Sequence, residues 1–202
     1  MRSPWDPLPD ALPAGTPRPA LAWLLIPILL LALVAATLGA FAHQTVPPAP
    51  SALYQPPYFH LFFSDVLQMK VWLTTAALLL ALTQLLTATR IYGLLHFPPQ
   101  GRFYNFLHRG TGYVAVGLTL PVAYHCIFLL GYGSISDART LVHAALGTAV
   151  YGVFVAKVFV VRQPTKFRGW VLPVLGSLLF TVILGLWLTS ALWVFSTAGF
   201  SL

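Results

Sequence analysis

Five long apolar stretches limit the fold of this 202-residue chain more than any single motif does. They cover approximately residues 20–42, 66–89, 110–130, 138–161 and 170–195. A helix of about 20 apolar residues is long enough to cross roughly 30 Å of hydrocarbon. The sequence therefore predicts an all-α integral membrane helical bundle with five transmembrane helices, in which an N-terminal helix precedes a four-helix core.

The composition agrees with a membrane protein and excludes several other classes. Only 7% of the residues are charged and 58% are hydrophobic, whereas a soluble domain carries about 25% charged residues. The chain has four aspartates and no glutamate, which argues against catalysis by a pair of buried carboxylates. Its net charge of +7 is spread between the apolar stretches, so it indicates a membrane topology and no nucleic-acid partner.

The lysines and arginines predict the orientation of the helices. Eight of them fall on one side of the predicted membrane and two on the other, if Lys157 inside a stretch is left out. Cytoplasmic loops carry the excess of Lys and Arg. We therefore expect the N-terminus inside and the C-terminus outside, in the bilayer of a prokaryotic cytoplasmic membrane. The eight are Arg2, Arg18, Arg90, Arg102, Arg109, Arg162, Lys166 and Arg168, and the two are Lys70 and Arg139.

Three segments follow along the chain. Residues 1–19 are rich in proline and predict a disordered cytoplasmic tail. Residues 20–64 contain the first transmembrane helix and an outer loop, and residues 65–197 form the four-helix core, with Asp65 as the expected cap of its first helix. The first apolar stretch ends in Ala-Phe-Ala, which resembles a signal-peptidase site, but its 23 residues exceed the apolar region of about 7–15 residues in a signal peptide. A retained helix is the favoured interpretation.

Two of the apolar stretches carry one deep histidine each. His125 lies about five residues before the third stretch ends, and His143 lies about five residues after the fourth begins. At a rise of 1.5 Å per residue, both lie roughly 8 Å below the same membrane face. An ionisable side chain inside the membrane is a functional-site hypothesis by default, because hydrocarbon disfavours it.

We interpret His125 and His143 as the two ligands of one haem b between the third and fourth helices. A short turn joins these helices and predicts that they are antiparallel neighbours, and neutral imidazole is a good ligand for haem iron. The alternative is a pair of histidines that bond to the backbone or to each other. The single cysteine, Cys126, excludes a C-x-x-C-H site, so any haem would be held without covalent bonds.

Helical spacing locates the positions where a second pair of ligands would lie. Fourteen residues return to nearly the same helix face about 21 Å away. Counted from the two histidines, this spacing leads to Thr111 and Lys157. Threonine is a poor iron ligand. For Lys157 two interpretations stay open: it snorkels to the headgroups, or it contacts a quinone, a lipid phosphate or an acidic partner.

Several neighbouring residues are candidates for contacts to the same cofactor. Gly117 and Gly147 leave space for a bulky planar molecule, although small residues also pack helices in membranes. Lys70 and Arg139 are placed to pair with a haem propionate by charge-assisted hydrogen bonds. Pro121, one turn before His125, frees a backbone carbonyl and is expected to kink the helix.

His108 and His96 define a less favoured second metal site. His108 lies at the inner start of the third helix but about 100° away from the face of His125. His96 lies in the proline-containing loop that precedes it. A haem held by these two would lie at the inner face.

The residues around both deep histidines resemble a known superfamily. The run FLHRGTGYVAVGLTLPVAYHCIFLLGY, followed by LVHAALGTAVYGVFVAKVFVVR, is similar to membrane b-type cytochromes of the cytochrome b561 and ferric-reductase-like superfamily. The pattern is closest to a small prokaryotic group of five-span proteins. The resemblance covers about residues 65–193 and leaves out the first helix.

The resemblance implies a four-helix core with two haems, each held by a histidine pair on adjacent helices, and electron transfer across the membrane. His125 and His143 match one pair, whereas Thr111 and Lys157 stand where the other pair is expected. The leading hypothesis is therefore an electron-transfer subunit of an oxidoreductase, with one haem b and a redox partner subunit, a quinone or a cytochrome c-type partner. A haem-free anchor or assembly subunit of a larger redox complex is the alternative. A quinone-linked or ferric-reductase-like enzyme with a separate donor subunit is a third.

Overall fold

A computed structural model describes residues 21–46, 60–96, 101–132 and 137–198, and these residues form helices and turns without a strand. Five segments are long and apolar enough to cross a membrane. The predicted all-α bundle with five spans is thereby confirmed. The predicted tail, residues 1–19, and much of the outer loop lie outside the described residues. The elements are α1 (Leu21–Gln44), α2 (Val66–Ile91), α3 (Arg102–Ala123), η2 (Tyr124–Leu130), α4 (Ala138–Arg162), η3 (Pro164–Lys166), α5 (Val171–Thr189) and α6 (Ala191–Ala198).

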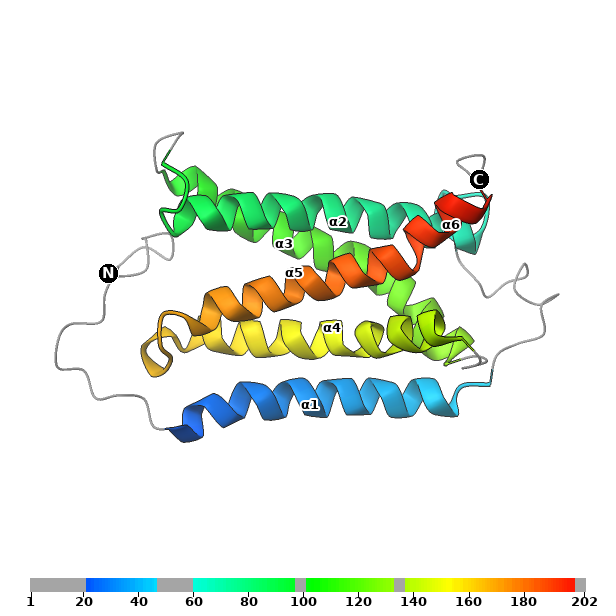
Figure 1. Ribbon diagram of the computed structural model, residues 1–202, viewed down its shortest axis with the longest axis horizontal. Helices are drawn as coiled ribbons and strands as arrows, with labels where there is room; N and C mark the ends of the chain where they lie inside the picture. Colours follow the sequence, from blue (N-terminus) through cyan, green and yellow to red (C-terminus); the bar gives the residue numbers. More distant parts are fainter. Residues whose placement is uncertain (1–20, 47–59, 97–100, 133–136, 199–202) are drawn as a thin grey trace.

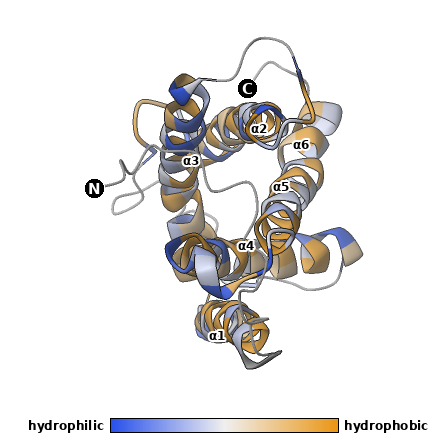
Figure 2. Cartoon of the chain, turned by 90° about the vertical axis from the view of Figure 1, so that its left-hand side faces the viewer, coloured by the Kyte–Doolittle hydropathy of each residue, from blue (hydrophilic) through white to orange (hydrophobic). Residues whose placement is uncertain are grey.

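Four helices form a ring, and the fifth lies outside it. Seen along the helices, α3, α2, α5 and α4 follow one another around the ring, and α1 lies beneath α4 (Figure 2). The closely packed pairs are α2 with α3, α4 with α5, α2 with α5, and α1 with α4. In the described part of the chain, α3 and α4 are not among them. The prediction of antiparallel packing between the two histidine helices is therefore too simple, because they meet mainly through longer side chains.

Tyr151 provides one such link across the ring. Its hydroxyl lies 3.1 Å from the carbonyl oxygen of Thr119 and 3.0 Å from the Thr119 Oγ1. Tyrosine is long enough to reach from α4 to α3 while their backbones stay apart. The ring therefore keeps a space at its centre without losing the connection between these two helices.

Two helix boundaries differ from the expectation. α3 begins at Arg102, so the second half of the predicted basic loop is helical. Helices need not end where the hydrocarbon ends, since arginines remain solvated among the headgroups. The fifth span, expected to run without a break, is interrupted at Ser190 (φ −122°, ψ −81°) and divides into α5 and α6.

The aspartates at the helix starts act as caps. The Asp65 carboxylate accepts a hydrogen bond from the amide of Gln68 at 2.8 Å, which confirms the cap predicted for α2. Asp137 caps α4 in the same way and accepts from the amides of Arg139 and Thr140. Such caps satisfy amides that have no partner within the first turn of a helix.

α1 approaches α4 closely at Gly152. A Cβ atom at Gly152 would lie 2.5 Å from the carbonyl oxygen of Leu31, so the two backbones touch there. Small residues allow this approach in membranes, where packing takes over from the hydrophobic effect. The opposite face of α1 is apolar and exposed, as at Ile28, Leu29 and Leu33. This pattern fits a helix that faces the ring on one side and lipid on the other.

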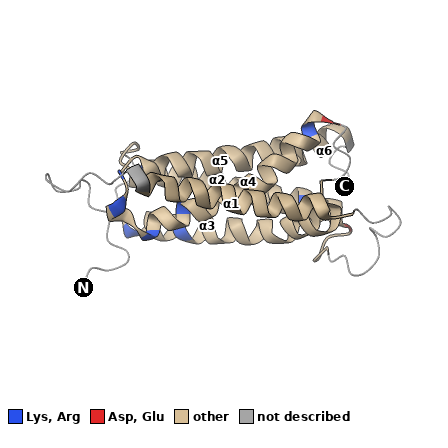
Figure 3. Cartoon of the chain, turned by 90° about the horizontal axis from the view of Figure 1, so that it is seen from below, with Lys and Arg blue, Asp and Glu red and all other residues tan. Residues whose placement is uncertain are grey.

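Charged residues gather at the ends of the bundle (Figure 3). We call one end the basic end; α1, α3 and α5 begin there, and α2 and α4 end there. Its described cations are Arg90, Arg102, Arg109, Arg162, Lys166 and Arg168. The other end carries Lys70, Arg139 and both described aspartates. Figure 1 shows that the spans run between these two ends.

Candidate functional site

His125 lies on a π-helical segment. η2 begins one residue before it, and the side chain of His125 is buried. Its Nδ1 lies 2.8 Å from the carbonyl oxygen of Pro121. The same carbonyl also accepts the backbone N–H of Tyr124, so one carbonyl oxygen takes both an amide and the imidazole. Single π-turns of this kind are frequent at functional sites.

His143 is held by a residue of another helix. Its Nδ1 lies 2.9 Å from the hydroxyl of Thr189 on α5. That hydroxyl in turn donates to the carbonyl oxygen of Gly185 at 2.7 Å. Because the threonine proton is used there, Thr189 accepts the hydrogen bond from the imidazole. His143 therefore carries its proton on Nδ1.

Arg139 fixes the same threonine from the other side. Its Nη1 donates to the carbonyl oxygen of Thr189 at 2.8 Å. The guanidinium also lies 3.4 Å from the Asp137 carboxylate and 4.2 Å from the ring centre of Trp193. Cation–π contact and ion pairing both favour this position. The break after α5 leaves the Thr189 carbonyl at a helix end, where a cationic donor compensates it.

The two histidines thus share one chemical state. A carbonyl can only accept, so His125, like His143, carries its proton on Nδ1, and in both rings Nε2 holds the lone pair. Histidines that bind metals almost always donate the other ring N–H to a carboxylate, a backbone carbonyl or water, and the Thr189 hydroxyl is an oxygen acceptor of the same kind. Both lie toward the end of the bundle opposite the basic end, as the helical count predicts.

α1 braces the segment that carries His125. The Thr45 hydroxyl donates to the carbonyl oxygen of Ile127 at 3.0 Å, and the amide of Tyr132 donates to the carbonyl oxygen of Ala42 at 3.0 Å. Between these contacts, Gly131 has φ +60°. The sequence predicts a first helix outside the haem-binding core, but the structure connects this helix directly to η2.

The other predicted contact residues have different surroundings. Lys70 lies close enough to His143 to act on it electrostatically, and its contact to a propionate stays a prediction. Arg139 is engaged with Thr189, Asp137 and Trp193, so its predicted role toward a propionate competes with these contacts. A Cβ at Gly147 would meet Leu186 of α5 at 3.9 Å, whereas one at Gly117 would meet no atom within 4 Å.

The basic half of the ring contains a separate polar cluster. The Gln84 side-chain amide donates to the carbonyl oxygen of His108 and to Thr111 Oγ1, the latter at 2.6 Å. Thr87 Oγ1 lies 2.9 Å from Nδ1 of His108. His96 is exposed beyond the end of α2. His108 is thus tied into α2–α3 packing, and its contacts do not include His96, its predicted partner at a second metal site.

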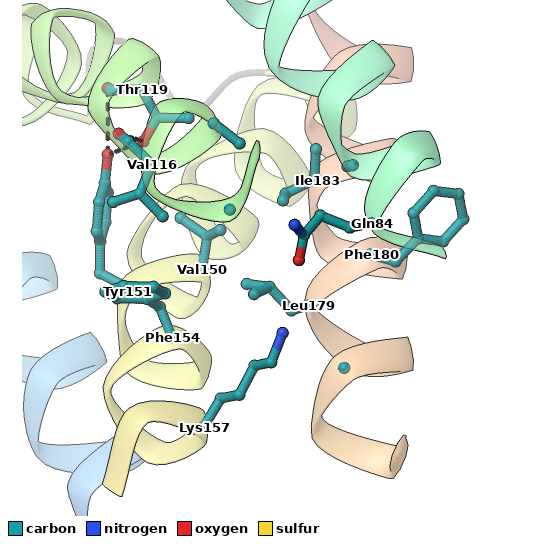
Figure 4. A pocket seen from close by; sticks show the side chains of 14 residues that line it. Gln84, Val116, Thr119, Val150, Tyr151, Phe154, Lys157, Leu179, Phe180 and Ile183 are labelled. Carbon is teal, nitrogen blue, oxygen red and sulfur yellow. Dashed lines mark hydrogen bonds between the residues drawn. The ribbon is translucent and has the colours of Figure 1, made fainter. Parts of the chain in front are cut away.

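Lys157 points into the ring. It lines a central cavity together with Gln84 (Figure 4). Of the two interpretations of this lysine, snorkelling to the headgroups does not describe the observed side chain. Within the described residues, no group of three or more His, Cys, Asp or Glu side chains could hold a metal ion.

A family model described as a family of unknown function (DUF6529) matches residues 24–202. The chain belongs to this family. The matched region includes α1, so the DUF6529 unit extends beyond the four-helix region in which the cytochrome resemblance was found. No curated protein and no solved structure matches the chain.

Thr189 and Gln84 are the two site residues that the sequence did not indicate. Thr189 lies 46 positions from its histidine, and a threonine in an apolar helix commonly bonds to its own backbone. The only available signal was its position near the same membrane face as His143. Gln84 is an amide in the middle of an apolar stretch, and such a polar side chain is itself a signal of a hydrogen bond between helices.

Proposed function

We propose that this member of the DUF6529 family is a membrane electron-transfer subunit that holds one haem b between α3 and α4. His125 and His143 would hold the haem iron, each through Nε2. The observation that carries the proposal is the matched state of the two rings: each Nδ1 is bonded at 2.8 or 2.9 Å to an oxygen of the protein. This arrangement orients an imidazole for ligation and raises its basicity.

The residues present fit the group chemically. Two neutral imidazoles are the usual donor set of a low-spin b-type haem, and a haem supplies one-electron chemistry when it is bound. The protein would orient the two imidazole rings, through the Pro121 carbonyl and the Thr189 hydroxyl, and would exclude water from the site. Lys70 is the cation placed to compensate a propionate.

Orientation and partners complete the proposal. We propose that the basic end faces the cytoplasm of a prokaryote, because cytoplasmic loops carry the excess of Lys and Arg. The histidines would then lie toward the outer face. The electron donor and acceptor are then separate: a redox partner subunit, a quinone or a cytochrome c-type protein. The packing of α1 onto α4 and η2 supports a single five-helix unit.

The test is the haem content of the purified protein. We expect a sharp α-band in the dithionite-reduced spectrum and a pyridine hemochrome signal near one haem per chain. His125→Ala and His143→Ala should each remove most of the haem, whereas His96→Ala, a matched change at an exposed histidine, should not. A protein without haem that co-purifies with redox subunits would instead establish the anchor function.

A further inference from the structure

The ring encloses a cavity in its basic half, away from the two histidines. Its volume is about 80 Å³, room for roughly five to eight waters at about 10–15 Å³ each. Most of its wall is apolar, with Val150 and Phe154 on α4 and Leu179 and Phe180 on α5. The Lys157 side chain extends into this space from α4 (Figure 4).

The charge of Lys157 is not balanced by a described acidic residue. No hydrogen bond or ion pair links its ammonium to another residue within the described ranges. Asp65 and Asp137, the two aspartates that the structure describes, both cap helices at the opposite end. On α3, His108 is close enough to Lys157 and to Arg109 to interact electrostatically with both. These α3 groups are basic, so they supply no anion for Lys157.

Gln84 does not neutralise the lysine. The amide is uncharged, and no hydrogen bond joins its Oε1 to the Lys157 ammonium in the described part of the chain. Its two N–H hydrogens are donated to the His108 carbonyl and the Thr111 hydroxyl, so the amide has no donor left for a ligand. Tyr151, at the far side of the cavity, donates to Thr119. Among the described residues that line the cavity, Lys157 is therefore the one cation, on a wall that is mostly apolar.

We infer that this cavity binds a membrane-soluble monoanion with an apolar body, such as a fatty carboxylate, whose head pairs with Lys157. A buried charge is stable in a low-dielectric site only when it is paired. Ligand sites are typically apolar with a few placed polar groups. A small hydrated anion would need several donors, and this wall offers one. The carboxylate and its first methylenes match the available volume.

The experiment uses the full chain in a neutral detergent, with decanoate as the probe and methyl decanoate as its uncharged match. Decanoate should raise the midpoint of thermal unfolding with a saturable titration, and the ester should not. Lys157→Met should weaken decanoate binding about tenfold or more, since loss of one partner from a buried charge pair has at least that effect. Lys166→Met, a matched change at an exposed lysine outside the cavity, should leave binding unchanged.

A second readout keeps the test valid if binding is weak. Lys157→Met should raise the unfolding midpoint of the ligand-free protein, because it removes an uncompensated charge. Ala115→Leu, which fills the cavity and leaves the lysine in place, should also abolish the effect of decanoate. Equal binding of acid and ester, or decanoate binding that survives Lys157→Met, would overturn the inference.

Two further binding measurements would identify a different ligand of the cavity. If 1,4-naphthoquinone binds more tightly than decanoate, and if its binding depends on Lys157, the ligand of the cavity is a neutral carbonyl compound and not an anion. Decanoate binding that appears only after Asp6→Asn with Asp10→Asn would show that the chain's own tail supplies the anion. Either result would overturn the inference. Haem content does not enter these measurements, so the cavity and the haem proposal can fail separately.

Discussion

The hydroxyl of Thr189 lies 2.9 Å from Nδ1 of His143 and donates its own proton to the carbonyl of Gly185. One threonine on α5 therefore decides which nitrogen of a histidine on α4 carries the proton. Arg139 holds the backbone of the same threonine. The position of the ring thus depends on a helix end as well as on its own helix.

Thr189→Val should remove the hydroxyl that accepts the hydrogen bond from His143 Nδ1 and should preserve the shape of the side chain. We expect haem affinity to fall by roughly 10–100-fold, the usual effect of losing a residue that orients a metal ligand, and the reduced α-band to shift. Thr189→Ser keeps the hydroxyl and should restore both. Haem titration of the purified variants measures this. Wild-type affinity and spectrum in the valine variant would contradict the assigned role.

Gly131→Ala should disrupt the junction between α1 and η2. The backbone at Gly131 (φ +60°, ψ −155°) is a conformation that costs a non-glycine residue about 1–3 kcal/mol. The added Cβ would also lie 2.7 Å from the carbonyl oxygens of Ala42 and Thr45. We expect the free energy of unfolding to fall by about 2 kcal/mol or more, as measured by thermal or denaturant unfolding.

Gly110→Ala is the matched control for that change. Gly110 lies within α3, and a Cβ there would meet no neighbouring atom within 4 Å. Alanine in a helix is favoured over glycine by roughly 0.5–1 kcal/mol. The control should therefore be neutral or slightly stabilising. Equal effects of the two substitutions would show that the α1–η2 junction has no special role.

The N-terminus of α4 should weaken in acid. Hydrogen bonds from the Arg139 backbone amide, and then from Thr140, hold the pKa of Asp137 below its ordinary value of 3.8. A carboxyl with a lowered pKa stabilises the folded state above its ordinary pKa, and this contribution is lost as the pH falls through the folded value. Amide exchange at Thr140 should therefore lose protection as the pH falls below about 4. Asp137→Asn keeps a cap and should remove this pH dependence; an unchanged profile would argue against the carboxylate.

Cysteine labelling tests the proposed orientation. In a Cys126→Ser background, Val46→Cys and Gln163→Cys place one thiol at each end of the bundle, both at exposed positions. A membrane-impermeant maleimide should label position 46 in intact cells and position 163 only after permeabilisation. The reverse pattern would place the histidines near the cytoplasm.

The sequence was sufficient to predict the number of spans and most of their limits. Apolar length alone located α1, α2 and α4, and Asp65 marked a helix start. It did not locate the start of α3, because the arginines at 102 and 109 read as loop residues although they lie on helical turns outside the hydrocarbon. The break at Ser190 carried no proline or glycine signal, so α6 was missed.

The sequence predicted only those features of the site that follow from positions along a single helix. The depths of His125 and His143 follow from residue counts along regular helices. The contact of Thr189 with His143 depends on which helix packs beside α4. The sequence alone does not show which helices pack together. The π-turn also changes the angular position of His125 relative to Thr111, so counts at 100° per residue hold less well across it.

The packing of α1 against α4 has a consequence for how the protein is made. α1 is synthesised before α4, yet its close partners are α4 and, through Thr45, a carbonyl 82 residues further along the chain. Until α4 is inserted, lipid covers the face of α1 that later contacts Gly152. The contacts that hold the segment around His125 are then still incomplete. Insertion of the helices and assembly of the histidine site are therefore separate stages of biogenesis, and the second waits for more than two thirds of the chain.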